Sequence, residues 1–131
     1  MQEVEFARET LRFAQMFLHI GVTNTWLYRM LLGRLYYAAH HLGRRLLVEI
    51  GMQPEQWRAN VHQRVLNELR RQYVTTGRMT LEAWRALDGL RDLRLRADYE
   101  LARPIRLRHV NHAVALFTRF SDECYQILGV S

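Results

Sequence analysis

Apolar residues recur every three or four positions along almost the whole chain, and this period constrains the fold more than any other feature. It places apolar side chains on one side of an α-helix. No stretch alternates apolar and polar residues for long enough to predict a strand. Short turns separate the periodic stretches, and helices joined by short turns pack as antiparallel neighbours. The sequence therefore predicts an all-α fold, a four- to five-helix up-and-down bundle.

Capping and helix-breaking residues set the expected limits of these helices. Gly21, Gly51 and Gly129 are suited to helix C-termini, and Thr80 is suited to an N-cap. A second N-cap is expected within residues 23–25, and a proline at position 104 breaks the preceding helix. We expect helices over residues 2–20, from about 25 to 50, from 54 to about 74, from about 81 to 101 and from about 105 to 128.

The second of these helices carries two glycines, Gly33 and Gly43, within its span. Glycine inside a helix costs about 1 kcal/mol relative to alanine, so we expect another backbone to come close there. Its apolar face is predicted to hold Leu31, Leu35, Ala38, Ala39, Leu42, Leu46 and Ile50. Its solvent-facing side is predicted to hold Arg34, Tyr37, His40, His41, Arg44 and Arg45.

The composition suits a single globular domain over residues 1–131. The formal net charge is +6 and all 19 basic residues are arginine, whose planar fork matches phosphate and carboxylate groups. This charge allows a nucleic-acid partner or an acidic protein partner. Charged residues interrupt the first twenty positions, so neither a signal peptide nor a membrane span is expected, and the cytoplasm is the default location.

Metal and cofactor sites are not predicted. The single cysteine, Cys124, allows neither an internal disulfide nor a cysteine-based zinc site. His109 and His112 have a usable ligand spacing, but no acidic residue stands beside them to complete a site. The chain also lacks a glycine-rich phosphate loop and the sequence motifs of serine hydrolases and zinc proteases.

The stretch from Arg91 to Leu101, RDLRLRADYEL, concentrates arginines and aspartates in one predicted helix. Arg94 and Asp98 are spaced i, i+4, so their side chains can touch. The base precedes the acid, which is the weaker order for stabilising a helix. This pair is either part of a functional site or an ordinary surface ion pair, which contributes only about 0–1 kcal/mol. We predict that Asp98 is paired with an arginine in the folded protein.

A second candidate surface is a stripe on the long second helix. Arg34, Tyr37, His41 and Arg45 recur at i, i+3, i+7 and i+11 and therefore share one side of the helix. Arginine forks beside an aromatic and a histidine ring suit a phosphate backbone and a stacked base. The alternative is that this stripe is simply the solvated face of the bundle.

Several segments together resemble the HEPN family of small helical prokaryotic domains, in particular the branch encoded beside MNT-type minimal nucleotidyltransferases. The resemblance rests on three pieces that occur in the family's order and spans roughly residues 25–128. They are GRLYYAAHHLGRRLL at residues 33–47, His62 followed by YVTTG at residues 73–77, and LRLRADYEL at residues 93–101. It implies a four- or five-helix bundle that dimerises.

The resemblance also implies a function. Many family members are metal-independent ribonucleases or toxins whose motif is an arginine followed, after four to six residues, by a histidine. Arg94 stands at that arginine, but Tyr99 follows at the expected place and no histidine occurs until His109. By resemblance, Arg94, Asp98 and Tyr99 form the site, and Arg34, Tyr37, His41, Arg45 and Arg91 contact RNA.

Three functions remain open at this point. The leading hypothesis is an RNA-binding and interaction module, homodimeric, in a toxin–antitoxin-like pair with a nucleotidyltransferase on another chain. The second is a metal-independent endoribonuclease that takes a histidine from elsewhere in the fold. The third is a structural subunit that presents substrate to the nucleotidyltransferase. We expect nuclease activity to be weak or absent, because neutral-pH cleavage of RNA favours a histidine near the scissile phosphate.

Overall fold

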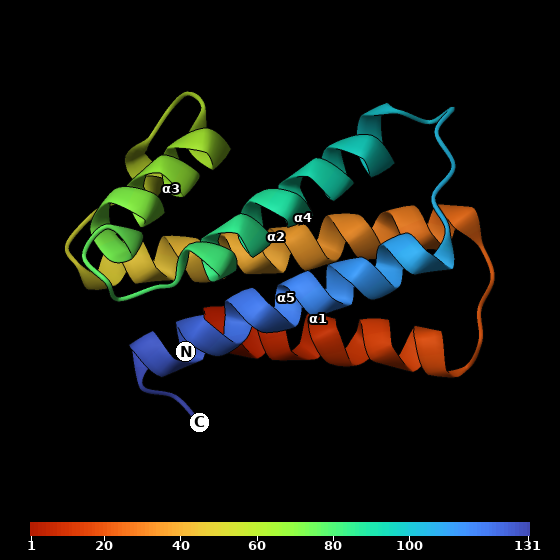
Figure 1. The fold of residues 1–131 in the computed structure, drawn as a ribbon, viewed down its shortest axis with the longest axis horizontal. Coiled ribbons are helices and arrows are strands. Elements are labelled where there is room, and N and C mark those ends of the chain that lie inside the picture. The colour runs from red at the N-terminus through yellow and green to blue at the C-terminus, as the bar shows by residue number, and fades with distance from the viewer.

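Four long helices alternate in direction along the molecule, and a short fifth helix is inserted at one end (Figure 1). The computed structural model describes residues 1–131 and confirms the all-α bundle, with five helices and no strands. The helices are α1 (Gln2–His19), α2 (Thr25–Glu49), α3 (Val61–Leu69), α4 (Leu81–Tyr99) and α5 (Leu107–Leu128). A 3₁₀ turn (Pro54–Gln56) precedes α3, and a π-helical turn (Arg70–Val74) continues it.

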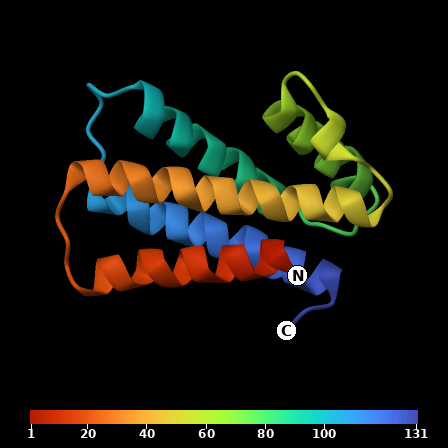
Figure 2. The ribbon, with the colours of Figure 1, turned by 180° about the vertical axis from the view of Figure 1, so that it is seen from behind.

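The long helix α2 is the centre of the bundle, since it packs against all four other helices. Figure 2 shows α2 running the length of the molecule, with α1 on one side of it and α3 and α4 on the other. Its buried residues include the predicted leucines and alanines of the apolar face, and they join a core that also holds Phe117 and Phe120 of α5. Ile50, which we expected in that face, is 37% exposed at the end of the helix.

The structure confirms the predicted helix caps. The side chain of Asn24 accepts hydrogen bonds from the backbone N–H groups of residues 26 and 27, so Asn24 is the N-cap among the three candidates. The Thr80 hydroxyl accepts a hydrogen bond from the Ala83 N–H at the start of α4. Gly129 ends α5 with φ of 71°, a left-handed conformation that glycine adopts without strain.

The third predicted helix was wrong in its first part. Residues 57–60 are not helical, and α3 begins only at Val61. The interruption ends at Asn60, whose φ of 55° is the one positive value among non-glycine residues. Asparagine tolerates this left-handed region better than most residues, so it can redirect the chain between the 3₁₀ turn and α3.

Gly43 explains how α3 reaches α2. A Cβ atom at Gly43 would lie 2.9 Å from Cδ1 of Leu69, which is closer than real contacts allow. At Gly33 the nearest atom to such a Cβ is Oδ1 of Asp98, at 3.8 Å, which is ordinary contact. The close approach predicted at both glycines is therefore made by side chains rather than by another backbone. Only at Gly43 would an added methyl group be too close to a neighbour.

Candidate functional site

A groove of about 730 Å³ lies between the first half of α2 and the second half of α4, with one residue of α3 on its wall. It is the largest hollow of the molecule, and it collects several of the residues predicted from the sequence. The lining residues are Trp26, Arg29, Met30, Gly33, Arg34, Tyr36, Tyr37, His62, Arg94, Ala97, Asp98 and Leu101.

The predicted pairing of Asp98 is confirmed. Nε of Arg94 lies 2.9 Å from Oδ2 of Asp98, and both side chains are partly exposed on the groove wall. The Arg94 guanidinium also lies 5.9 Å from the ring centroid of Tyr36 and 5.7 Å from that of Tyr99. Tyr99 is the last residue of α4, which ends two residues earlier than expected. Leu101, expected in the apolar face of this helix, is 61% exposed.

The structure divides the predicted stripe on α2 into two parts. Arg34 and Tyr37 line the groove, with the guanidinium 5.9 Å from the tyrosine ring. His41 instead packs edge-on against the Tyr37 ring and borders a smaller hollow beside α1. Arg45 forms an ion pair with Glu49 at 2.5 Å. Only the first half of the stripe therefore belongs to the groove.

Arg91 also lies outside the groove lining. Its Nη1 donates a hydrogen bond of 2.6 Å to Oε1 of Gln63 on α3, so it bridges α4 to α3 beside His62. Its charge nevertheless acts on the histidine, because Arg91 is one of the groups that lower the pKa of His62.

A cluster that the helical wheel did not predict lies at the α3 end of the groove. The hydroxyl of Tyr36 and Nδ1 of His62 are 2.6 Å apart, and the His62 ring stacks on the ring of His40 with centroids 4.2 Å apart. His40 is 3% exposed, which corrects its expected place on the solvent-facing side of α2. Tyr36 is 2% exposed, so its hydroxyl needs the partner that His62 provides.

Burial sets the protonation of this cluster. Desolvation raises the pKa of Tyr36 to about 12, so its hydroxyl keeps its proton at neutral pH. Desolvation, followed by the charge of His62, lowers the pKa of His40 to about 3. Desolvation and then the charges of Arg94, Arg91 and Arg44 also lower the pKa of His62. Both histidines are therefore neutral at pH 7.

Arg29 fixes the wall of the groove at its other end. This side chain is 6% exposed and donates to backbone carbonyls at the end of α4 and in the following loop, including Ala97 at 2.9 Å and Leu101 at 3.1 Å. Carbonyls at a helix C-terminus lack partners within the helix, and a cation there also interacts favourably with the helix dipole. Sequence reasoning missed Arg29 because its partners lie about seventy residues away.

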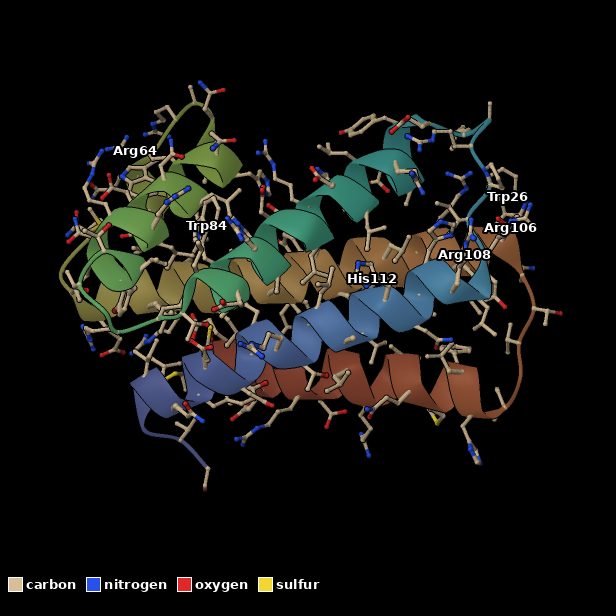
Figure 3. All side chains as sticks on the ribbon, viewed as in Figure 1. Trp26, Arg64, Trp84, Arg106, Arg108 and His112 are labelled. Atoms are coloured by element: carbon tan, nitrogen blue, oxygen red, sulfur yellow. The ribbon has the colours of Figure 1, made fainter.

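The indole of Trp26 lies at the open end of the groove, 60% exposed and 5.6 Å from the Arg29 guanidinium. Figure 3 places it at the end of the molecule where α5 begins, and the Thr25 hydroxyl donates to the Ile105 carbonyl there. Trp84 differs, because its indole donates a 2.8 Å hydrogen bond to the Leu66 carbonyl and ties α4 to α3. Trp26 is therefore the tryptophan that a ligand in the groove can reach.

Comparisons with protein-family models, with curated proteins and with solved structures found no match to this chain. None of its helices has the combination of length and apolar character needed to cross a membrane.

Proposed function

We propose that this chain is an RNA-binding and interaction module that holds a single strand in the groove between α2 and α4. One observation supports this most directly: three arginines of the groove each lie within 6 Å of an exposed aromatic ring. The pairs are Arg29 with Trp26, Arg34 with Tyr37, and Arg94 with Tyr99. The three rings are 60%, 43% and 71% exposed, so their faces can be reached by a ligand.

This combination suits single-stranded RNA better than a duplex. Bases of a single strand can turn outward and stack on aromatic rings, which contributes about 1–3 kcal/mol per base. The forks of Arg34 and Arg94, which are at least partly exposed, can bind the phosphates that connect the bases, whereas Arg29 is buried and donates to backbone carbonyls. A duplex keeps its bases stacked within the helix and therefore cannot use the rings in this way.

The interaction role rests on the resemblance and on exposed apolar side chains. Near the α1–α2 turn, three large apolar residues outside the groove lining are exposed to solvent: Phe13, Met16 and Ile20. Exposed apolar residues gathered in one region are typical of protein interfaces. We propose that this end contributes to a homodimer, and that the module works in a toxin–antitoxin-like pair with an MNT-type nucleotidyltransferase on a separate chain. Presenting substrate to that enzyme is the structural alternative.

Cleavage of the bound RNA is a second candidate function, and one observation favours it. Although no histidine follows Arg94 at the family spacing, the fold brings His62 from α3 into the groove that Arg94 lines. A histidine beside an arginine supplies a proton acceptor and a positive charge, the two groups that metal-independent cleavage requires.

Fluorescence anisotropy with a labelled single-stranded RNA tests the binding proposal. We expect Arg34→Ala and Tyr37→Ala to weaken binding, and Arg34→Ala to reduce the slope of log affinity against log salt by about 0.7 if it removes one phosphate contact. Arg58→Ala is the matched control, because Arg58 is exposed and lies outside the groove lining. Equal affinity of all three variants and the unaltered protein would refute the groove as the binding site.

A further inference from the structure

The ring of His62 reaches the groove from a different helix than the arginine and aspartate that the sequence singled out. Its Nδ1 atom is engaged by the hydroxyl of Tyr36 at 2.6 Å. The ring of Tyr36 in turn lies 5.9 Å from the Arg94 guanidinium. Tyr36, His62 and Arg94 all line the same groove, so a phosphate held by Arg94 lies on the surface that the histidine also borders.

We propose that His62 is the proton-transferring residue of this groove, acting on a phosphodiester of single-stranded RNA, with Tyr36 as its positioning residue. This inference rests on the second candidate function, cleavage. In this role His62 replaces Tyr99, the residue at the family position. Tyr99 is 71% exposed at the end of α4 and belongs with the base-stacking rings.

The contact with Tyr36 decides which nitrogen of His62 meets the substrate. Since Nδ1 faces the tyrosine hydroxyl, Nε2 is the nitrogen left for another partner. Proton uptake at Nε2 uses the tautomer in which Nδ1–H donates to the tyrosine oxygen, and the imidazolium that forms retains this donation. The tyrosine contact therefore orients the ring and leaves Nε2 as the nitrogen that can exchange a proton with the substrate.

The ring of His40 helps to hold the ring of His62 in place. The His40 ring is buried and lies 4.2 Å from the ring of His62 at an angle of 30°, so one face of the catalytic ring is covered. Burial and the charges of Arg94, Arg91 and Arg44 lower the pKa of His62, which keeps the ring in the neutral form that a base must have at pH 7.

The nucleophile of the proposed step is the ribose 2′-oxygen, so the step needs neither a metal ion nor an attacking water molecule. Nε2 of His62 takes the proton of a ribose 2′-hydroxyl, and the 2′-oxygen attacks the adjacent phosphorus. The bond from phosphorus to the 5′-oxygen of the next nucleotide breaks, and that oxygen takes a proton from solvent. Arg94 stabilises the negative charge on the phosphoryl oxygens. The products are a 2′,3′-cyclic phosphate and a 5′-hydroxyl, and His62 then returns its proton to solvent.

The test uses the full chain and a single-stranded RNA of mixed sequence, labelled at one end, in buffer containing EDTA. We expect slow cleavage that leaves 2′,3′-cyclic phosphate ends, and no cleavage of DNA of the same sequence, which lacks the 2′-hydroxyl. His62→Gln should lower the cleavage rate by roughly 100-fold or more, the scale of a lost general base. His112→Gln, on an exposed ring of α5 (Figure 3), is the matched control and should leave the rate unchanged.

Two further measurements separate a catalytic role from a structural one. Free imidazole should restore part of the activity of His62→Ala, which it cannot do for a variant that is merely misfolded. Tyr36→Phe removes only the hydroxyl and should lower kcat while KM stays unchanged. Circular dichroism of each variant checks that the helices are retained.

The outcomes also separate this inference from the binding proposal. RNA that binds in the groove but is not cleaved by the unaltered protein would overturn the role of His62 and leave the binding proposal intact. Cleavage that persists at full rate in His62→Gln, or cleavage of the DNA, would overturn the inference as well. Failure of the unaltered protein to bind RNA at all would refute both.

Discussion

Two parts of α2 are packed in different ways: an apolar end around Leu46, and a polar end around Tyr36 that is also the α3 end of the groove. Around Leu42 and Leu46, the helix meets Phe120 and other apolar side chains of α3 and α5, and the buried Tyr73 hydroxyl donates to the Leu46 carbonyl there. Around Tyr36 and His40, polar side chains are buried or half-buried against one another. Burying a polar group costs free energy unless it finds a partner, so a cluster of them is not what stability alone would select.

We therefore expect the two regions to respond differently to substitution. The apolar end needs only residues of the right size, whereas the polar end needs particular partners at particular distances. If this comparison is correct, substitutions at the apolar end change stability and leave RNA binding intact. Substitutions at the polar end change binding, cleavage or the pH dependence of stability.

The largest effect is expected from Phe120→Ala in the apolar end. The Phe120 side chain is fully buried, and removing a buried phenylalanine ring typically costs about 3–5 kcal/mol. Urea denaturation should show this loss of unfolding free energy. RNA affinity at a temperature where the variant remains folded should be unchanged, and a parallel loss of affinity would contradict the separation of the two ends.

Acid should destabilise the polar end selectively. The pKa of His40 is lowered from 6.5 to about 3 by burial, so the unfolded chain binds a proton that the folded protein does not. Stability is therefore fully present above about pH 6.5 and falls by about 1.4 kcal/mol per pH unit below it. His40→Gln should make the unfolding free energy less dependent on pH between about pH 6 and pH 4. An equal slope in both proteins would show that His40 is not the group responsible.

A pair of glycines offers a smaller and sharper contrast. Gly43→Ala places a methyl group 2.9 Å from Leu69, and such overpacking costs about 1–3 kcal/mol. Gly33→Ala meets nothing closer than 3.8 Å and should stabilise α2 by up to about 1 kcal/mol through helix propensity. Thermal melting of the two variants measures the opposite signs. Two shifts of the same sign would show that the approach of α3 to Gly43 is looser than the structure indicates.

The apolar part of this comparison could be predicted from sequence. Helical periodicity predicted five helices and six of the seven residues assigned to the apolar face of α2, and capping residues predicted the start of α4 at Thr80 and the end of α5 at Gly129. These features depend on residues close together in the chain, which is why local rules describe them well.

The polar part could be predicted only in fragments. The Arg94–Asp98 pair was found because its members are one helical turn apart. The helical wheel assigned His40 to solvent because it allows one buried face, whereas α2 is surrounded by four helices and buries several. The contact of Tyr36 with His62 spans 26 residues, and those of Arg29 span about 70. A tyrosine and an arginine placed among leucines were the available signals, since each needs a polar partner there.

The smallest change in stability, and the most informative one for the groove, is expected from Asp98→Asn. The carboxylate is 40% exposed, and ion pairs of this kind contribute about 0–1 kcal/mol because water screens them. The melting temperature should therefore fall only slightly. The asparagine cannot hold the Arg94 guanidinium by charge, so the arginine is free to leave its place between the rings of Tyr36 and Tyr99.

A role in the site therefore predicts weaker binding of single-stranded RNA in a protein that stays folded, by up to about tenfold, or 1.4 kcal/mol. Asp122→Asn on α5 is a suitable control, because this exposed acid forms no ion pair and lies far along the chain from the groove lining. Both variants lose one negative charge, which by itself favours binding of a polyanion. A loss of affinity in Asp98→Asn alone must therefore come from the position of Arg94. A lower melting temperature with unchanged affinity would instead reduce the pair to a surface ion pair.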